Sequence, residues 1–478
     1  MEIKDLQGKL VAVLGFGMEG RATAAFLMKH GIRPTLFDQK PLSDWGPEDQ
    51  SFIKSLRLNC IFGPDCFKEL AGFDVAFRSP GISLHNISLV LPSGVEGKLR
   101  ITSQTKWFFE HCPAKIIGIT GTKGKGTTSS LIYEMLHASR FMLHAKSYLT
   151  GNIGKVQPLE ILDNLSADDW VVYELSSFQL QDLTQSPRIG VVLMVTGEHL
   201  DYHKNIKEYR QAKCPIVKFQ KPGDTAIINH DFPASMAIGA FGKGQKLFFS
   251  RIKALKSGCF VKGGKMVWNF SGGAGSRSAG QFPVAGLQLR GRHNLENVCA
   301  AVLAGLTAGC PPKVIKDVLK KFKGLEHRLE FVAEKKGVKF FNDSFSTTPE
   351  TCLAAIESFS EPEILILGGS SKNSDFKELG RGIRAARNIK AVILIGQEAK
   401  KIKSAIQMTL TPNPSPRGRG EGFAFLEGAK NMREIFAQVK STAKPGDVVL
   451  LSPACASFDM FKSYVDRGNQ FKLAVKSY

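Results

Sequence analysis

The chain carries Gly118-Ile119-Thr120-Gly121-Thr122-Lys123-Gly124-Lys125-Gly126-Thr127-Thr128, a glycine-rich stretch that directly follows the apolar residues Ile116 and Ile117. Glycines let backbone N–H groups turn inward around a phosphate, a lysine adds positive charge, and a hydroxyl can reach Mg²⁺. A helix that begins here points the positive end of its dipole at the same anion. The stretch therefore predicts a strand, a phosphate-binding loop and a helix.

One position departs from the usual form of such a loop. Serine or threonine normally follows the lysine, whereas here Gly126 follows Lys125 and Thr127 comes one residue later. The alternative interpretation is a glycine-rich turn that caps an ordinary helix. The predicted ATP-binding residues of this loop are Gly121, Thr122, Lys123, Gly124, Lys125, Gly126, Thr127 and Thr128.

Length and composition indicate a multidomain globular protein. The 478 residues are 43% hydrophobic and 22% charged, and no apolar run is long enough to span a membrane. The first residues lack the layout of a signal peptide. Nine cysteines occur without a Cys-x-x-Cys pair, so we expect reduced thiols, a cytoplasmic location and no insertion into membranes.

The net charge is strongly basic. There are 64 lysines and arginines against 43 aspartates and glutamates, a formal charge of +21. Basic residues are spread along the whole chain, however, and aromatic residues are not interleaved with them as in RNA-binding modules. We therefore expect small polyanionic molecules as partners, and no nucleic acid.

A second nucleotide-binding pattern lies near the N-terminus. A short apolar strand, residues 10–14, precedes Gly15-Phe16-Gly17-Met18-Glu19-Gly20, and a strand over residues 35–38 ends at Asp38. This is the G-x-G-x-x-G of a dinucleotide site with its later acidic residue, which contacts a ribose. The pattern predicts a nucleotide diphosphate held at a helix N-terminus.

The middle of the chain contains two nearly continuous apolar runs, residues 170–174 and 189–196. Such runs are typical of parallel strands that are covered on both faces. Glu174 ends the first strand, and His199 follows the second. Because ligands bind at the carboxyl ends of parallel strands, we expect both side chains to face the phosphate loop.

The last third contains three further buried strands, over residues 363–367, 391–395 and 447–451. Residues 411–422 are rich in proline and glycine and predict a surface insertion without a catalytic part. The expected fold is α/β with three domains. These are a Rossmann-like domain over residues 1–113, a central P-loop ATPase-like domain with a mainly parallel sheet over 114–323, and a Rossmann-like domain over 324–478.

Taken together, these motifs resemble the ATP-dependent Mur ligases of peptidoglycan synthesis over nearly the whole chain. The run Glu174-Leu175-Ser176-Ser177-Phe178-Gln179-Leu180 is the most discriminating. The other matching segments are Ser79-Pro80-Gly81, Gly151-Asn152-Ile153-Gly154, Thr196-Gly197-Glu198-His199-Leu200-Asp201, Tyr209-Arg210-Gln211-Ala212-Lys213, Gly291-Arg292-His293-Asn294-Leu295-Glu296-Asn297, His327-Arg328-Leu329-Glu330, Asn342-Asp343-Ser344 and Ser452-Pro453-Ala454-Cys455-Ala456-Ser457-Phe458-Asp459.

The resemblance implies an enzyme that adds glutamate to UDP-N-acetylmuramoyl-L-alanine, with ATP as co-substrate, through an acyl phosphate. It implies two Mg²⁺ ions and a carbamylated Lys213, whose oxygens suit a hard metal. The oligomeric state expected is a monomer. The implied catalytic residues are Lys125, Glu174, His199 and Lys213, and the implied metal ligands are Thr127, Glu174, His199 and Lys213.

The resemblance also assigns a ligand to each domain: the UDP substrate to the first, ATP to the second and glutamate to the third. Further ATP-binding residues are Asn294, Asn297, Arg328 and Asp343. The implied residues for the UDP substrate are Phe16, Gly17, Met18, Asp38, Ser79, Pro80, Gly81, Asn152, Ser176 and Gln179. The implied residues for glutamate are Lys372, Ser457, Phe458 and Tyr464, although Phe458 and Tyr464 are equally explained by helix packing.

Four positions depart from the family pattern. Gly126 stands where serine is usual, Met194 and Gly197 replace the usual residues before His199, and Phe345 stands where a lysine near the glutamate is common. The missing lysine removes a carboxylate partner. The handedness of the glutamate is therefore open: the resemblance implies D-glutamate by default, and L-glutamate is the alternative.

Three alternatives have different functions. A folylpolyglutamate synthase would explain Gly126 but not the UDP-type first domain. An NAD-dependent oxidoreductase would use residues 15–38 alone and leaves the phosphate loop unexplained. A non-catalytic binding protein would explain the departures at Gly126 and Phe345.

Overall fold

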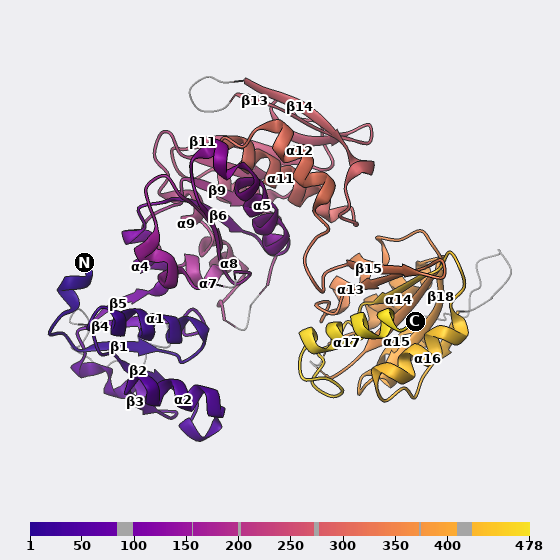
Figure 1. Ribbon diagram of the computed structural model, residues 1–478, viewed down its shortest axis with the longest axis horizontal. Coiled ribbons are helices and arrows are strands. Elements are labelled where there is room, and N and C mark those ends of the chain that lie inside the picture. Colours follow the sequence, from indigo (N-terminus) through magenta and orange to yellow (C-terminus); the bar gives the residue numbers. More distant parts are fainter. Residues whose placement is uncertain (84–98, 155, 199–201, 272–276, 372–373, 409–422) are drawn as a thin grey trace. The chain divides into compact units, whose positions relative to one another are not determined.

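The structure is a computed structural model that describes residues 1–83, 99–154, 156–198, 202–271, 277–371, 374–408 and 423–478 (Figure 1). The chain divides into two compact units. The first contains residues 1–286 and 295–318, and the second contains residues 287–294 and 319–478. Three sheets with flanking helices confirm the predicted α/β fold. The predicted insertion 411–422 lies outside the described residues.

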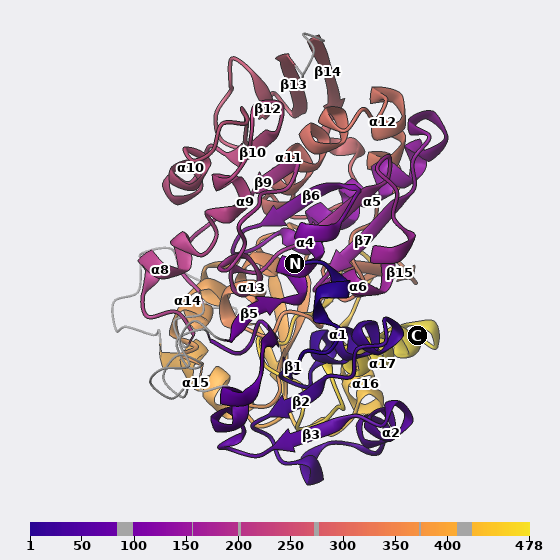
Figure 2. The same cartoon turned by 90° about the vertical axis from the view of Figure 1, so that its left-hand side faces the viewer.

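The N-terminal sheet has five parallel strands in the order β3-β2-β1-β4-β5, with β1, β2 and β3 side by side in Figure 2. All four residues of β1 are buried, as expected for a central parallel strand. The strands are β1 (Val11–Leu14), β2 (Thr35–Asp38), β3 (Asn59–Phe62), β4 (Val75–Arg78) and β5 (Arg100–Ser103), and the helices are α1 (Met18–Lys29), α2 (Pro47–Leu56) and α4 (Gln104–His111).

The N-terminal and central sheets share one hydrophobic core. Trp107 and Phe108 of α4 belong to the same buried cluster as Tyr173 of the central sheet. The Phe108 and Tyr173 rings lie 5.7 Å apart, and the hydroxyls of Thr105 and Tyr173 are hydrogen-bonded at 3.0 Å. The first two predicted domains are therefore packed into one unit, and their boundary after residue 113 remains a prediction.

The central sheet has nine strands in the order β14-β13-β12-β11-β10-β9-β6-β8-β7. It is mainly parallel, as predicted, but β13 and β14 form an antiparallel edge that the sequence did not predict. The strands are β6 (Lys115–Thr120), β7 (Ser147–Gly151), β8 (Trp170–Glu174), β9 (Ile189–Val192), β10 (Thr225–Asn229), β11 (Gln245–Ser250), β12 (Gly258–Lys262), β13 (Lys265–Ser271) and β14 (Arg277–Pro283), and the helices are α5 (Lys125–Leu143), α6 (Pro158–Ile161), α7 (Ser177–Leu180), α8 (Ile206–Gln211), α9 (Pro215–Lys218), α10 (Pro233–Gly239), α11 (His293–Thr307) and α12 (Pro312–Lys321).

The strand predicted over residues 189–196 is shorter than expected, because β9 ends at Val192. The Leu193 N–H still donates to the Thr120 carbonyl of β6, and from Val195 onward side-chain hydroxyls are the hydrogen-bond partners. The Val195 N–H donates to Ser235 Oγ, and the Thr196 N–H donates to Thr122 Oγ1. The apolar residues after β9 thus continue as a loop that packs over the phosphate loop.

The C-terminal sheet has six strands in the order β15-β16-β20-β17-β18-β19, parallel except for the pair β15 and β16. The three predicted strands are present as β17, β18 and β20. No helix in the described residues is long and apolar enough to cross a membrane. The strands are β15 (Glu330–Lys335), β16 (Val338–Asn342), β17 (Glu363–Gly368), β18 (Ile389–Ile395), β19 (Ala424–Leu426) and β20 (Val448–Leu451), and the helices are α13 (Pro349–Ile356), α14 (Lys377–Ala385), α15 (Ala399–Met408), α16 (Met432–Thr442) and α17 (Tyr464–Lys476).

Candidate active site

The phosphate loop has the predicted strand–loop–helix geometry. β6 ends at Thr120 and α5 begins at Lys125. Gly124 caps the helix with a φ of 88°, and a Cβ at this position would collide with the amide of Asn297 on α11. The position therefore requires glycine on both counts. Asn297, one of the predicted ATP-binding residues, lies beside the loop.

Hydrogen bonds hold this loop in shape. Lys125 Nζ donates to the carbonyls of Gly121 at 3.0 Å and Thr122 at 3.2 Å. The Thr122 and Tyr209 hydroxyls lie 3.0 Å apart. Lys123 Nζ, in contrast, reaches out to Glu198 Oε1 at 2.8 Å. The loop is thus preorganised around the position where a phosphate would bind.

Lys213 lies behind the loop and is only 1% exposed. Its Nζ donates to Thr120 Oγ1 and to the Gly121 carbonyl, both at 3.3 Å, and lies 4.6 Å from the centre of the Tyr209 ring. Burial, and secondly the nearby charge of Lys125, lower the pKa of Lys213 well below its usual value. A neutral amine is the form of lysine that reacts as a nucleophile.

The predicted metal ligands are only partly within the described residues. Glu174 ends β8 and is buried, and Thr127 is buried in the first turn of α5. A carboxylate and a hydroxyl are hard oxygen donors, and so they fit Mg²⁺. His199 lies outside the described residues. Within the described part, no group of three or more His, Cys, Asp or Glu side chains could hold a metal by itself.

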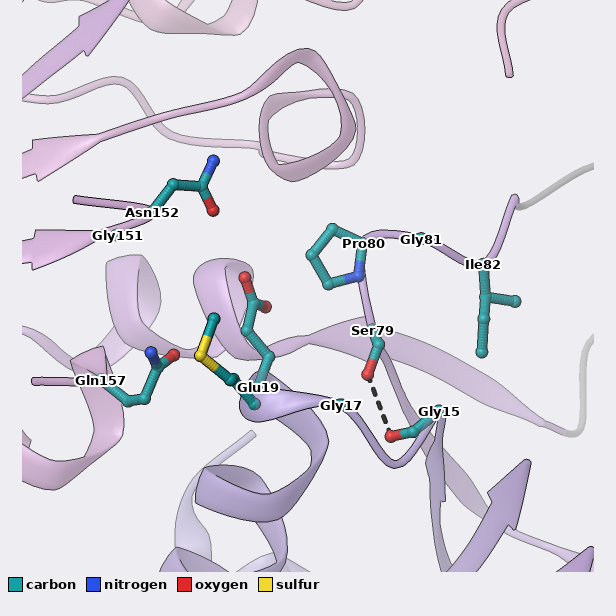
Figure 3. Close-up of a pocket in the computed structure, with 11 residues that line it drawn as sticks. Gly15, Gly17, Glu19, Ser79, Pro80, Gly81, Ile82, Gly151, Asn152 and Gln157 are labelled. Atoms are coloured by element: carbon teal, nitrogen blue, oxygen red, sulfur yellow. Dashed lines mark hydrogen bonds between the residues drawn. The ribbon is translucent and has the colours of Figure 1, made fainter. Parts of the chain in front are cut away.

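A pocket of about 350 Å³ lies between the glycine loop of the N-terminal sheet, the loop after β4 and the end of β7 (Figure 3). Ser79 Oγ donates to the Gly15 carbonyl at 3.2 Å and joins two of these segments. Six predicted UDP-substrate residues line the pocket: Gly17, Met18, Ser79, Pro80, Gly81 and Asn152.

Two other predicted residues shape the glycine loop from outside the pocket. Asp38 Oδ2 accepts the Phe16 N–H at 2.7 Å, and Asp38 Oδ1 accepts the Lys40 N–H at 2.8 Å. The Phe16 ring is buried and packs edge-on against Trp45, with ring centres 5.0 Å apart. Phe16 is therefore a packing residue beneath the glycine loop and does not line the pocket.

Ser176 and Gln179 reach the pocket through Glu19, which the sequence analysis did not select. Ser176 caps α7 by accepting the Gln179 N–H at 3.2 Å. Gln179 Nε2 donates to Glu19 Oε1 at 2.7 Å, and Glu19 lines the pocket. The position of Glu19 inside the Gly15–Gly20 pattern is the sequence feature that could have predicted this role. Ile82 and Gln157 were also missed, and no sequence pattern marks them.

Arg78 is a further residue that sequence reasoning missed. Its guanidinium is fully buried and pairs with Asp182 Oδ2 at 3.1 Å. It also donates to the Ile82 carbonyl at 2.8 Å and to the Phe178 carbonyl at 3.2 Å. Arg78 thus fastens the loop after β4, which carries Ser79, to the central sheet.

The remaining predicted ATP-binding residues belong to the second unit. Asp343 Oδ2 accepts from Ser452 Oγ at 2.8 Å, and burial raises the pKa of Asp343 to about 7. The Arg328 guanidinium lies 3.9 Å from the centre of the Phe345 ring, in a cation–π arrangement. Asn294 Nδ2 donates to the Arg290 carbonyl at 2.6 Å. The second unit therefore supplies an aromatic ring where a lysine is common in the family.

Three of the predicted glutamate residues, Ser457, Phe458 and Tyr464, are described in the second unit. The fourth, Lys372, lies outside the described residues. Ser457 is buried, whereas the Phe458 side chain is 75% exposed, so helix packing does not explain Phe458. The Phe458 N–H donates to Ser370 Oγ at 3.2 Å. Tyr464 begins α17, and its ring centre lies 5.0 Å from that of Phe345.

Arg467 on α17 supports these loops from below. It is fully buried and donates to four oxygens: Ser344 Oγ and the Ser344 carbonyl at 2.9 Å, the Cys455 carbonyl at 3.1 Å and the Ala456 carbonyl at 3.2 Å. Burial lowers the pKa of Arg467 to about 10. One side chain thus joins the segment after β16 to the segment after β20, where the predicted glutamate residues begin.

Comparison with known proteins places this geometry in a family. Residues 119–305 match the Mur ligase middle domain, and residues 327–455 match the Mur ligase glutamate ligase domain. Solved structures of similar fold include UDP-N-acetylmuramate–alanine ligase MurC of Thermotoga maritima, with a TM-score of 0.57, 15% identity and coverage of 98% of this chain and 99% of that chain. The chain belongs to the Mur ligase family.

Full-length relatives narrow the comparison to one member of that family. A protein of Pelotomaculum thermopropionicum is 37% identical over 99% of both chains. Another, of Acetivibrio thermocellus, is 36% identical over 99% of this chain and 97% of its own. Both are named UDP-N-acetylmuramoylalanine–D-glutamate ligase.

Proposed function

We propose that this chain is an ATP-dependent amide ligase that joins D-glutamate to UDP-N-acetylmuramoyl-L-alanine in peptidoglycan precursor synthesis. The proposal is carried by the phosphate loop and a separate G-x-G-x-x-G pocket in one compact unit of a chain that matches ligases of that name over its full length. Two sites match the two nucleotides of this reaction, ATP and the UDP-linked substrate. Neither an oxidoreductase nor a folate ligase requires both.

The reaction begins with a carboxylate, which is a poor electrophile. The alanine carboxylate attacks the γ-phosphorus of ATP, which gives an acyl phosphate and ADP. The glutamate amine then attacks the acyl carbon and loses a proton, and inorganic phosphate leaves. Because the reactants are anions, the protein contributes mainly placement and positive charge. We assign Lys125 and the glycine-rich loop of residues 121–128 to the β- and γ-phosphates.

Bound Mg²⁺ would neutralise phosphate charge beside the substrate carboxylate. We propose Thr127, Glu174, His199 and a carbamylated Lys213 as the residues that hold two ions. Carbamylation needs a neutral amine, and burial lowers the pKa of Lys213 in that direction. The product replaces a buried neutral amine with an anion that offers oxygen ligands.

We assign the three ligands to separate groups of residues. The uridine substrate occupies the pocket of Figure 3, with Asp38 shaping the glycine loop. Asn294, Asn297, Arg328 and Asp343 bind ATP, and Lys372, Ser457, Phe458 and Tyr464 receive glutamate. The relatives' name supports D-glutamate. Phe345, which carries no charge, makes L-glutamate the enantiomer to test beside it.

The deciding experiment is a phosphate-release assay with UDP-N-acetylmuramoyl-L-alanine, ATP and Mg²⁺, and with D- or L-glutamate in parallel. We expect phosphate release with D-glutamate and formation of the glutamyl product. Release with L-glutamate alone would change the substrate but keep the ligase class. Turnover only with a folate would replace the proposal with the folylpolyglutamate alternative.

Lys213→Ala tests the carbamate. Turnover should fall about 100-fold, as for loss of a group that supports a metal. Small carboxylates such as acetate should restore part of it by filling the vacated space with an anion. Lys218→Ala, which removes an exposed lysine from the same region, is the matched control. If carboxylates restored no turnover to Lys213→Ala, or if Lys218→Ala lost as much turnover as Lys213→Ala, the carbamate would be contradicted.

We also propose a monomer that acts in the cytoplasm. All nine cysteines are free thiols, which suits a reducing compartment. Sedimentation velocity of the purified chain tests the oligomeric state, and a stable dimer would contradict it.

A further inference from the structure

Glu19 places a carboxyl group in the pocket that we assign to an anionic diphosphate. Among the described residues that line the pocket, it is the only titratable one. Figure 3 shows its side chain extending into the pocket from the start of α1, between Asn152 and Pro80. Two anions in one pocket repel each other, so this position needs an explanation.

The two carboxyl oxygens of Glu19 are used differently. Oε1 accepts from Gln179 Nε2 at 2.7 Å. Oε2 is buried and has no hydrogen-bond partner among the described residues. A buried polar atom without a partner is costly, unless a ligand satisfies it. The geometry therefore leaves one hydrogen-bonding atom for the molecule that fills the pocket.

The surroundings of Glu19 bring its protonation close to balance near neutral pH. Burial raises its pKa to about 7, and Asp182 adds to this, whereas the Gln179 hydrogen bond and the charge of Arg78 act in the opposite direction. Tyr173, a further titratable group that interacts with Glu19, has a pKa well above its usual value because it is buried, so it stays neutral. A bound anion would shift the balance further towards the neutral carboxyl.

We infer that Glu19 contacts the UDP-linked substrate as a neutral carboxyl, donating from Oε2 to an oxygen of the substrate, and that binding takes up one proton from solvent. This rests on the proposed function, which supplies the substrate. No bond of the substrate is broken. The solvent proton adds to the Glu19 carboxylate and remains there while the substrate is bound. Glu19 is thus a specificity residue that accepts an anion where an ionised glutamate would reject it.

The sign of the pH dependence follows from this linkage. Since the bound state holds a proton that the free state loses above about pH 7, the Kd should increase by up to about tenfold per pH unit above that point. The opposite arrangement is an ionised Glu19 that accepts from a hydroxyl or amide of the substrate. In that case binding would release a proton, and the Kd would decrease as pH increases.

Calorimetric titration of the full chain with UDP-N-acetylmuramoyl-L-alanine, without ATP, tests the inference. Titrations at about pH 6 and pH 8, each in two buffers of different ionisation enthalpy, count the protons exchanged. For the wild type we expect uptake close to one proton at the higher pH and close to none at the lower. Glu19→Gln should abolish the uptake and bind more tightly than the wild type at the higher pH. Glu69→Gln, at an exposed acid of the same sheet region, should behave as the wild type.

Gln179→Leu is a second variant, useful if Glu19→Gln does not fold. It removes the hydrogen bond that favours the carboxylate, so the uptake should begin at a higher pH than in the wild type. Proton release, no exchange, or unchanged uptake in Glu19→Gln would overturn the role of Glu19, while substrate binding and the proposed function stand. Failure of the wild type to bind this substrate would overturn the proposed function itself.

Discussion

Arg78 and Arg467 are both fully buried beneath predicted substrate loops, but their charges are balanced in different ways. Arg78 in the first unit has a carboxylate partner, Asp182. Arg467 in the second unit makes no ion pair within the described residues and donates to a hydroxyl and three carbonyls instead. The second unit also contains Glu363, a fully buried carboxyl with no hydrogen-bond partner in the described part of the chain.

This difference follows from what each arginine joins. Arg78 lies at the end of β4, and Asp182 comes from the segment after α7, so the pair connects the N-terminal sheet to the central sheet. Arg467 connects two loops of one sheet, where carbonyl groups already converge. Buried charge is tolerated when it is paired or fully hydrogen-bonded. The first unit thus balances its buried arginine with an ion pair between two sheets. The second unit balances its buried arginine with hydrogen bonds to carbonyl and hydroxyl oxygens of one sheet's loops.

The largest effect should come from Asp182→Asn, which leaves the Arg78 charge buried without its partner. We expect the first unit to lose about 3–5 kcal/mol of unfolding free energy. All four tryptophans lie in that unit, so urea unfolding followed by tryptophan fluorescence reports on it specifically. Asp224→Asn, in the exposed pair with Arg188, should cost no more than about 1 kcal/mol. Equal losses would remove the distinction between the two pairs.

Glu363 should make the second unit sensitive to pH. Burial raises its pKa to about 8, so between about pH 4.5 and pH 8 the folded state binds more protons than the unfolded state. Stability should therefore fall as pH rises, by up to about 1.4 kcal/mol per pH unit, or about 5 kcal/mol over the whole interval.

Asp343, whose pKa is about 7, contributes the same sign only up to that pH, so the interval above it isolates Glu363. Hydrogen exchange of amides in β17 and β20, corrected for intrinsic rates, measures the slope. Glu363→Gln should abolish the slope above about pH 7. A slope that persists in this variant would assign the titration to another group.

Arg467→Lys keeps the positive charge but removes the planar guanidinium group. An ammonium cannot reach four oxygens arranged around a guanidinium, and we expect a loss of about 2 kcal/mol in the second unit. Hydrogen exchange in β16 and β20 should accelerate, while tryptophan fluorescence unfolding of the first unit stays unchanged. If the proposed glutamate site is correct, the KM for glutamate should rise. An unchanged second unit would mean that the four hydrogen bonds contribute little.

The smallest effects concern two helix N-caps, Ser463 at the start of the helix that carries Arg467 and Ser103 beside the Arg78–Asp182 pair. Ser463 Oγ accepts the Asp466 N–H at 3.1 Å, so Ser463→Ala should cost about 1 kcal/mol. Ser103 Oγ accepts the Lys106 N–H at 3.1 Å and also donates to Asp182 Oδ1 at 3.4 Å. Ser103→Ala should therefore cost somewhat more than Ser463→Ala in unfolding experiments. The reverse order would mean that Ser103 does not support the ion pair.

Local patterns predicted most of the fold and part of the site. The loop over residues 121–124, the Gly15–Gly20 turn and the buried parallel strands were visible because spacing and apolar runs are properties of contiguous residues. The early end of β9 was not visible, since it depends on the Ser235 and Thr122 hydroxyls from other segments. The antiparallel edge of β13 and β14 was not predicted, because β13 alternates buried and less buried residues and so contains no continuous apolar run.

The sequence by itself determined where the two glycine-rich loops and the helices after them begin, because glycine conformations and helix starts are encoded within a few residues. Only the tertiary structure decided which charges are balanced and how. Arg78 and Asp182 are 104 residues apart, and Glu19 meets Gln179 across 160 residues. Burial and partnership set the energy of a charge, and both arise when distant segments pack together.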